Sequence, residues 1–538
     1  MVESSPTVIP RPSTKKHSTK WGHLCGLSIT LRNPQVPSLN IKTTPEEFSF
    51  NSKKFNVTTV HGVVEPIELH PVEAFKALQF KDHPAFISES RSPEKGASRY
   101  SYICPNVRTI VRTGPDESYG DVDPIETLRK KFKSQSVPPL ANLPALITGA
   151  FGFIGYEAIK HFEPSIKNLP KDPTGSPVSA FVFPAELLVF DHELNQIHII
   201  VFSETGNTFN AAIDRISEIS RTLDTASLTN QVNQVLDTEA PDIHRTSLVS
   251  DIEYKKRVNS ARNTIIAGEL IQVVLGRRIT INTSANPLDI YEHLTTMNPS
   301  PYMYLVDLGD MQIIGASPEL MIRSKGNVAS IHPIAGTRPR GDTAEEDLQN
   351  EADLISNEKE TAEHVMLVDL ARNDLGRVCK IGSVKVQSLK HVERYSHVMH
   401  LVSRIEGHLS KDNSGLDAFK AGFPIGTLSG APKLRAIQLI ADLEMEGRGP
   451  YCGGIGWFGQ NGDVDTGTII RSIILRGGVA HVQGGAGIVF DSEPISENLE
   501  SLQKMKAPLL AIAKAEVTKS QQSINDATLR HPVRVMTK

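Results

Sequence analysis

The sequence predicts an α+β fold, in which strands and helices occur in separate groups. In the N-terminal half, short apolar stretches lie between turns rich in glycine and proline, a pattern typical of strands. In the second half a group of strands is followed by helices, without the regular strand–helix alternation of a doubly wound parallel sheet. No internal repeat indicates a solenoid or a propeller.

In the N-terminal half, hydrophobic patterning predicts three strand segments and then a helix. The predicted strand segments span residues 107–111, 145–154 and 186–202, and the predicted helix spans 210–223. A polar stretch with weak periodicity comes next, which favours a linker over about residues 223–249.

The second half opens with a predicted helix, and several strands follow it before the next helices. The predicted elements are a helix at 253–267, strands at 270–281, 303–308, 311–316 and 319–323, helices at 347–373 and 417–421, a glycine-rich strand region at 452–489 and a final helix at 496–514.

Composition divides the chain into an extension, two folded regions and a tail. Residues 1–45 are rich in Ser, Thr, Pro and Lys, and Glu3 is the only acidic residue before Glu46. An organellar transit peptide has this composition, and so does a disordered tail, which we favour because Arg11 is the only arginine of the first thirty residues. We expect folded regions at 55–222 and 250–515, and a tail at 516–538.

Charge and cysteine content exclude several classes of function. The formal net charge of -4 gives no reason to expect a nucleic acid or an anionic membrane as a partner, and no apolar run approaches the ~20 residues that span a bilayer. The four cysteines (Cys25, Cys104, Cys379 and Cys452) show no CxxC pairing, so neither a zinc site nor a disulfide framework is indicated. We therefore expect a cytoplasmic protein, or an organellar one if residues 1–45 are a transit peptide.

Two predicted helices carry charged residues that permit a metal site. On the last helix, Glu497, Glu500 and Lys504 lie three and four residues apart and share one face. On the helix at 347–373, carboxylates such as Glu360 and Glu363 are mixed with apolar residues, and polar groups in so apolar a run need partners. Carboxylates from two helices suit a hard cation such as Mg2+. A surface ion pair on one helix and a buried salt-bridge network on the other explain the same residues without a metal.

A cluster of small residues, Gly484, Gly485, Ala486 and Gly487, lies between two apolar stretches. Consecutive small residues let backbone N–H groups approach an anion closely, and a tight hairpin explains them equally well. No helix opens on the cluster with the spacing of a dinucleotide fingerprint.

Five long motifs follow one another over the second half of the chain. They read IHPIAGTRPRG at 331–341, KETAEHVMLVDLARNDLGR at 359–377, YSHVMHLVSR at 395–404, FPIGTLSGAPK at 423–433 and QGGAGIVFDSEP at 483–494. Together they resemble the chorismate-utilising enzymes, and among these most closely the large subunits of anthranilate synthases. The resemblance runs in order over about residues 250–515, with a weaker match that extends to about residue 55.

The resemblance implies a fold and a reaction. The fold would be two large antiparallel β-sheets packed as a sandwich and flanked by helices, with the N-terminal and C-terminal regions interleaved. The region 55–222 would be regulatory, and the region 250–515 would bind chorismate. The implied enzyme is a lyase that uses Mg2+ and ammonia to aminate chorismate and then eliminates pyruvate to give anthranilate, the first step of tryptophan biosynthesis.

The resemblance also assigns roles to individual residues. The implied catalytic residues are Glu319 (the general acid for the departing hydroxyl), His400 (pyruvate elimination), Gln272 and Thr427. The implied substrate contacts are Gly336 and Thr337, Tyr451 and Arg471 for the enolpyruvyl carboxylate, a carboxylate-binding turn at Gly485, Ala486 and Gly487, and Lys504. The implied ligands of Mg2+ are Glu363 and Glu500, and the metal would neutralise the ring carboxylate.

Two positions bear on the product. Ala335 stands where relatives that make aminodeoxychorismate carry a nucleophilic lysine, and alanine cannot form that covalent intermediate. Gln272 stands where relatives that add water carry a lysine base; a neutral amide cannot act as that base, but it can orient ammonia. Both positions favour anthranilate over the nearest alternative, an aminodeoxychorismate synthase. A non-catalytic tryptophan sensor is the alternative from another class.

Two segments resemble the tryptophan-inhibition site of the family. NPSPYM at 298–303 places Pro301, Tyr302 and Met303 at the inhibitor, and ISES at 87–90 adds Ser90. The second match is partial because Ser88 replaces a leucine; a proline-fixed turn and an ordinary strand end explain both segments without an inhibitor. Gly276, where the family usually has serine or proline, is a further departure that we expect to loosen an inhibitor-proximal or substrate-proximal strand.

None of the four cysteines lies in the GxCxG turn that a glutaminase nucleophile requires. We therefore expect a separate glutamine amidotransferase subunit, in a heterodimer or heterotetramer, and the use of free ammonia without it.

Overall fold

The computed structural model describes most of the chain beyond residue 37. The described residues are 38–65, 69–80, 83–92, 96–204, 206–229, 246–247, 249–395 and 398–530. The expected extension lies mostly outside them. Its last part does not, because Ser38–Ile41 form strand β1 beside β2 and Thr44 caps helix α1, so the extension ends earlier than residue 45.

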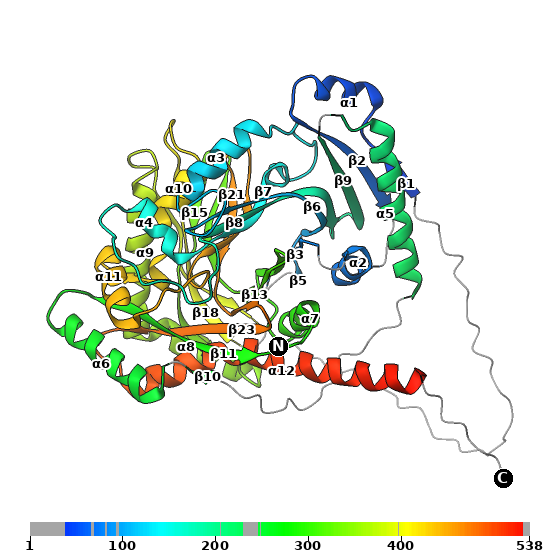
Figure 1. The fold of residues 1–538 in the computed structure, drawn as a ribbon. Helices are drawn as coiled ribbons and strands as arrows, with labels where there is room; N and C mark the ends of the chain where they lie inside the picture. The colour runs from blue at the N-terminus through cyan, green and yellow to red at the C-terminus, as the bar shows by residue number, and fades with distance from the viewer. Residues whose placement is uncertain are drawn as a thin grey trace, which may run out of the picture. The chain divides into compact units, whose positions relative to one another are not determined.

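Helices and strands alternate irregularly along the chain (Figure 1). The helices are α1 (Pro45–Ser52), α2 (Pro71–Leu78), α3 (Pro124–Ser134), α4 (Ile159–Phe162), α5 (Phe209–Thr229), α6 (Asp251–Ile266), α7 (Pro287–Met297), α8 (Ala344–Ser356), α9 (Glu358–Gly376), α10 (Gly415–Gly422), α11 (Lys433–Glu444) and α12 (Pro494–Arg530). Three 3-10 turns are η1 (Ala145–Thr148), η2 (Tyr156–Ala158) and η3 (Gly426–Leu428).

The strands of the first half are β1 (Ser38–Ile41), β2 (Val57–Glu65), β3 (Ala85–Glu89), β4 (Arg91–Ser92), β5 (Gly96–Ala97), β6 (Tyr100–Thr113), β7 (Ala150–Ile154), β8 (Ser179–Asp191), β9 (Gln196–Glu204) and β10 (Thr246–Ser247). Those of the second half are β11 (Gln272–Asn282), β12 (Tyr302–Asp307), β13 (Met311–Ser317), β14 (Leu320–Lys325), β15 (Val328–Ile331), β16 (Ile334–Pro339), β17 (Lys385–Arg394), β18 (Val398–His408), β19 (Gly430–Ala431), β20 (Gly454–Phe458), β21 (Val464–Thr468), β22 (Ser472–Arg476) and β23 (Val479–Ile488).

Strands from the two halves of the sequence pair with each other. β3 pairs antiparallel with β12, and β7 pairs antiparallel with β20. Within the described residues, such pairings join 21 strands into one hydrogen-bonded sheet, and β4 and β5 form a separate pair. This confirms the α+β class, the antiparallel arrangement and the interleaved halves. Hydrogen bonds between strands join the two sheets that the resemblance implied into one continuous sheet.

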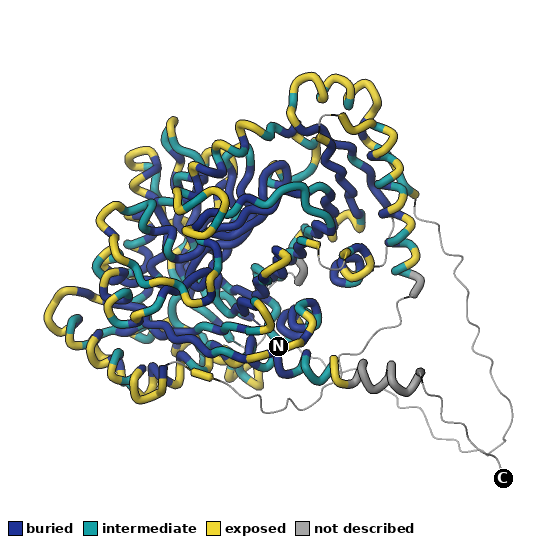
Figure 2. The backbone as a smooth tube through the Cα atoms, viewed as in Figure 1, coloured by how far each residue is buried: buried dark blue, intermediate teal, exposed yellow. Residues whose placement is uncertain are grey.

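Three hydrophobic clusters hold these elements together. One cluster consists almost entirely of strand residues. Within it the Phe86 and Phe151 rings stack 4.5 Å apart, and Trp457 meets both of them edge to face. A core lined by strands on both sides is what two stacked sheet faces produce. The other two clusters place helices on sheet faces: α6, α9, α10 and α11 in one, and α2, α5, α7 and α12 in the other. Figure 2 shows the buried strands inside and the exposed outer faces of the helices.

Several predicted boundaries differ from the structure for local reasons. The segment 186–202 is two strands, β8 and β9, because the chain turns at Asn195, whose φ is 52°. Residues 145–148 form η1 before β7 begins at Ala150. The predicted helix 347–373 is two helices, α8 and α9, because Asn357 ends one and caps the other by accepting from Glu360 N.

Six helices were absent from the sequence prediction: α1, α2, α3, α4, α7 and α11. Four of them, α1, α2, α3 and α7, begin at a proline that directly follows a side-chain N-cap (Thr44, His70, Asp123 and Asn286). An N-cap followed by proline is a known helix start, so this signal could have found at least α1, α3 and α7. α4 and α11 begin without a side-chain cap.

The predicted linker and tail are shorter than expected. α5 continues to Thr229, and Thr246 and Ser247 pair with β11, while residues 230–245 lie outside the described part. α12 continues past the predicted end at residue 514 to Arg530, so most of the expected tail is helical backbone. No helix in the described residues is long and apolar enough to cross a membrane.

Candidate active site

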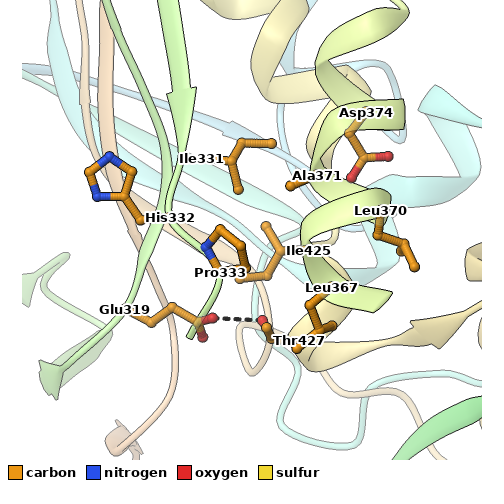
Figure 3. A pocket seen from close by; sticks show the side chains of 11 residues that line it. Glu319, Ile331, His332, Pro333, Leu367, Leu370, Ala371, Asp374, Ile425 and Thr427 are labelled. Atoms are coloured by element: carbon orange, nitrogen blue, oxygen red, sulfur yellow. Dashed lines mark hydrogen bonds between the residues drawn. The ribbon is translucent and has the colours of Figure 1, made fainter. Parts of the chain in front are cut away.

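Glu319 lies at the centre of the candidate site, between β13 and β14. Thr427, in η3, donates a hydrogen bond of 2.7 Å from Oγ1 to Glu319 Oε1. The carboxyl is 5% exposed, and burial raises its pKa to about 7. Figure 3 shows both side chains at one end of a small cavity, whose apolar wall comes from α9, from Ile331 and from Ile425. A carboxyl with this pKa is partly protonated near neutral pH, as a general acid must be.

His400 lies on β18 opposite Thr337 of β16. Its Nδ1 is 2.9 Å from Thr337 Oγ1 and 3.3 Å from the carbonyl oxygen of Gly336. Gly336 sits at an irregularity in the strand register with φ of +74°, a conformation that favours glycine. Burial lowers the pKa of His400 to about 4, so its imidazole is neutral at pH 7. The structure therefore brings together three of the predicted site residues here.

The glycine cluster is strand, which corrects the predicted turn. Gly484 to Gly487 lie inside β23, and Gly485 pairs with Gly276 of β11. The small residues permit close packing: a Cβ on Gly484 would lie 2.7 Å from the Ser501 carbonyl oxygen of α12, and one on Gly487 would lie 2.9 Å from Gln272 Nε2. β23 pairs with β22 only as far as Val482. Beyond this residue β23 pairs with β11 along one edge, and its other edge has no strand partner among the described residues. A strand edge of this kind can offer backbone N–H groups to an anion.

Gln272, the first residue of β11, therefore packs directly against the glycine strand. Its side chain is buried, and its Oε1 has no hydrogen-bond partner within the described residues. A buried amide oxygen without a partner is a ready acceptor for a small N–H donor such as ammonia.

Two cations lie beside this strand. Lys504 on α12 donates from Nζ to the Gly485 carbonyl oxygen at 2.9 Å and forms an ion pair of 2.6 Å with Glu500. Arg471 has φ of 52°, and its Nη1 donates to the Lys504 carbonyl oxygen at 3.3 Å. Burial lowers the pKa of Arg471, and the nearby Tyr451, Glu500 and Glu319 act against this effect. A half-buried guanidinium with room for further partners suits a carboxylate ligand.

The predicted metal ligands Glu363 and Glu500 come from α9 and α12. Burial raises the pKa of Glu363 to about 7, and repulsion from Glu360, Glu497 and Glu500 adds to this shift. Carboxylates that repel one another in this way favour a nearby cation, and two of them already have one: Glu360 pairs with Arg338 and Glu500 with Lys504. No three Asp, Glu, His or Cys side chains of the described residues already form a metal-binding group. Mg2+ commonly binds through one or two protein carboxylates plus its substrate, so two glutamates fit this ion.

The salt-bridge explanation for α9 holds for other residues of the helix. Asp374 forms a buried ion pair with Lys433 at 2.8 Å, and Glu360 pairs with Arg338 at 3.1 Å. His364, next to Glu363, is fully buried and contacts Ser403 of β18 through Nε2 at 2.6 Å. The polar residues of α9 thus form structural contacts at these positions, while the charge of Glu363 is influenced by Glu360, Glu497 and Glu500.

The two segments of the expected inhibitor site are neighbours in space. β3 and β12 pair with Glu89 opposite Met303, and the Arg91 N–H donates to the Ser300 carbonyl oxygen at 3.1 Å. Ser90 and Pro301 therefore lie on adjoining strand ends. The Met303 side chain is fully buried, and the Tyr302 hydroxyl donates to Asp465 at 2.8 Å.

Gly276, a departure from the family pattern, is not loosely packed. Its N–H donates to Glu444 Oε1 at 2.6 Å, and a Cβ at this position would meet Tyr451 Cε1 at 3.2 Å. The expected loosening of this strand is therefore not seen, and Gly276 packs beside Tyr451, one of the expected substrate contacts.

Some residues of the site escaped the sequence analysis. The Tyr395 ring meets the His400 ring edge to face at 5.4 Å. Glu497, which the sequence analysis placed on one helix face with Glu500 without giving it a role, also acts on the charge of Glu363. Arg448 and Glu444 pair with each other four residues apart and are buried between the site segments. Their other partners, on β11 and at Leu428, are distant in the sequence, so no local pattern marked the pair as part of the site.

Comparison with known proteins gives a family. Residues 84–510 match the family model described as chorismate binding enzyme. The chain is 40% identical over 491 residues to anthranilate synthase component 1 of Acetivibrio thermocellus, covering 88% of this chain and 98% of that protein. It is 36% identical over 482 residues to anthranilate synthase component 1 of Saccharomyces cerevisiae, covering 87% of this chain and 94% of that protein.

A solved structure agrees with these relatives. The crystal structure of anthranilate synthase component I from Streptococcus pneumoniae superposes with a TM-score of 0.68 at 36% identity, covering 76% of this chain and 92% of that chain. The match over most of the length, together with the converging site residues, places the protein: the chain belongs to the chorismate-binding enzymes.

Proposed function

We propose that this chain is the large subunit of an anthranilate synthase, which aminates chorismate with ammonia and eliminates pyruvate. The observation that carries the proposal is the buried Glu319 carboxyl, held by Thr427 and partly protonated near neutral pH. The relatives named anthranilate synthase component 1 support it over most of the chain length.

Two cationic side chains would bind the two carboxylates of chorismate. Arg471, with Tyr451 beside it, would hold the enolpyruvyl carboxylate, because its half-buried guanidinium carries donors in a fork. The backbone edge of β23 and Lys504 would lie at the ring carboxylate. Gly336 and Thr337 would contact the substrate beside His400.

In the first stage, ammonia adds to the ring and the hydroxyl leaves. Gln272 would orient ammonia by accepting one of its N–H groups at the unpartnered Oε1. Glu319 would donate its proton to the departing hydroxyl oxygen, which leaves as water. Thr427 would steady the carboxylate that this step produces.

In the second stage, the ring loses a proton and pyruvate leaves. The neutral imidazole of His400 can accept a proton at pH 7, since its pKa is about 4 in the absence of substrate. Elimination makes the ring aromatic, which drives the step forward. Ala335 and Gln272, in place of the lysines of related activities, favour anthranilate as the product.

Glu363 and Glu500 would hold Mg2+, which would neutralise the ring carboxylate and make the ring a better electron acceptor.

Tryptophan would inhibit at the β3–β12 junction, near Ser90, Pro301, Tyr302 and Met303. A separate glutamine amidotransferase subunit would supply ammonia from glutamine, because none of the cysteines lies in a glutaminase motif.

Turnover of chorismate tests the proposal. The purified chain with ammonium and Mg2+ should form fluorescent anthranilate and an equal amount of pyruvate, whereas glutamine alone should yield almost none. Glu319→Gln should lower the rate by about 10²–10⁴-fold, the usual contribution of general acid catalysis. An aminated product that retains the enolpyruvyl group, without pyruvate, would instead indicate an aminodeoxychorismate synthase. No consumption of chorismate would leave the tryptophan sensor.

A further inference from the structure

Arg448 is buried between three segments of the site, and its side chain is fully partnered. An arginine has five N–H donors, and each of them has an acceptor here. Nε and Nη2 donate to the two carboxylate oxygens of Glu444 at 2.9 and 2.6 Å. The other three donate to the carbonyl oxygens of Val274 and Leu428 at 2.7 and 2.9 Å, and to Cys452 Sγ at 3.4 Å.

Each of these contacts ends next to a residue of the proposed machinery. Leu428 follows Thr427, the partner of Glu319. Val274 lies on β11, two residues after Gln272. Cys452 follows Tyr451, whose ring centre is 5.7 Å from the guanidinium carbon of Arg448. The guanidinium therefore joins the segments that carry Thr427, Gln272 and Tyr451.

Glu444 completes this junction. Its Oε1 also accepts the N–H of Gly276, so the same carboxylate holds β11 two residues beyond Val274. Val274 in turn donates its N–H to the Ser429 carbonyl oxygen at 2.9 Å. Arg448 and Glu444 are 3% and 6% exposed. The cost of burying this pair is offset only because every donor is satisfied.

We propose that Arg448, paired with Glu444, is a positioning residue that fixes Thr427, Gln272 and Tyr451 relative to one another for the amination of chorismate. This rests on the proposed function. Arg448 does not touch the reacting atoms; it acts through the carbonyl groups of β11 and η3. A change at this residue therefore alters geometry at three points at once.

The test is Arg448→Lys, with Arg215→Lys as the matched control. A lysine has one nitrogen and three N–H donors, so it cannot span Glu444, Val274 and Leu428 together. Arg215 is also paired in two hydrogen bonds with a buried carboxylate, Glu186, but lies on α5, which contributes no residue to the proposed site. Ammonium-dependent kcat, KM for chorismate and Tm are measured for both variants.

Arg448→Lys should lower kcat by about 10–100-fold, the effect expected when reacting groups are misplaced by about an ångström. Arg215→Lys should lower Tm by a similar amount but keep the wild-type kcat. The alkaline limb of the pH–rate profile should also move to higher pH in Arg448→Lys, because the hydrogen bond from Thr427 that lowers the pKa of Glu319 is weakened. If Arg448 served only the stability of the fold, Arg448→Lys would lower the rate by the same factor at every pH.

A double variant separates the two explanations further. If Arg448 acts through Thr427, then Thr427→Val should lower kcat by a smaller factor in the Arg448→Lys background than in the wild type.

If Arg448→Lys does not fold, the Glu444→Gln/Arg448→Met variant removes both charges together and leaves none unpaired. A kcat within twofold of wild type, with Tm lowered as in the control, would overturn the inference and leave the proposed function standing. A wild-type chain that makes no anthranilate would overturn the proposed function itself.

Discussion

Thr427 Oγ1 donates to Glu319 Oε1 across 2.7 Å, although 108 residues separate the two in the sequence. Two opposing effects act on the Glu319 carboxyl. Burial raises its pKa, whereas the hydrogen bond from Thr427 and the charges of Lys504 and Arg471 lower it. The balance leaves the pKa near 7, where the group can both hold and release a proton.

Removing this hydrogen bond should shift the pH dependence of the reaction. A hydroxyl that donates to a carboxylate stabilises the ionised form, so Thr427→Val should raise the pKa of Glu319. A bond of this kind contributes about 1.5–3 kcal/mol, which corresponds to about 1–2 pH units. The alkaline limb of kcat should move upward by that amount, and Thr427→Ser should retain the wild-type profile. An unmoved limb in Thr427→Val would show that Glu319 is not the acid that titrates.

Removal of the metal or of its ligand should abolish turnover. Glu363→Gln keeps the size of the side chain but removes a charge from the carboxylate cluster, so Mg2+ should no longer raise Tm or support anthranilate formation. Excess chelator should have the same effect on the wild type. Glu358→Gln, on the exposed first turn of α9, is the control and should respond to Mg2+ as the wild type does. A Glu363→Gln variant with normal Mg2+-dependent turnover would exclude this glutamate as a ligand.

A methyl group on the glycine strand should disturb the site through packing. The Cβ of Gly484→Ala would lie 2.7 Å from both Met505 Cγ and the Ser501 carbonyl oxygen, so α12 must move together with Glu500 and Lys504. Overpacking of this kind costs about 1–3 kcal/mol. We expect a lower free energy of unfolding in urea and a raised KM for chorismate. Gly376→Ala, which meets open space, is the control. Unchanged stability and KM in Gly484→Ala would contradict the close approach of α12.

Tryptophan should inhibit the wild type, and Ser90→Phe should relieve the inhibition. Ser90 lies where β3 ends beside the start of β12, and a phenylalanine ring there would occupy the space next to Pro301. Initial rates of anthranilate formation are compared with and without millimolar tryptophan. Ser52→Phe, on exposed α1, should stay as sensitive as the wild type. Wild-type rates that do not respond to millimolar tryptophan would refute the regulatory site.

The sequence was sufficient for features that depend on local pattern or on long motifs. Periodicity predicted β11, β12, β13 and β14 to within a few residues, because their buried residues form a clear apolar pattern. It did not predict β15 to β19. The spacing of Glu500 and Lys504 predicted an ion pair that the structure confirms at 2.6 Å. The motifs assigned residues to one proposed site, and the structure joins some of them by hydrogen bonds, including Glu319 with Thr427 and His400 with Thr337.

Only the tertiary structure decided how distant segments meet. The glycine cluster reads equally well as a turn, and it is a strand because β11 pairs along it and α12 packs on it. Arg448 looks like any other charged residue in the sequence. Its five acceptor atoms belong to residues 444 and 452 nearby and to residues 274 and 428 far away in the chain. The physical reason is the same in both cases: pairing and burial depend on contacts between residues far apart in the chain, and a local pattern holds no record of them.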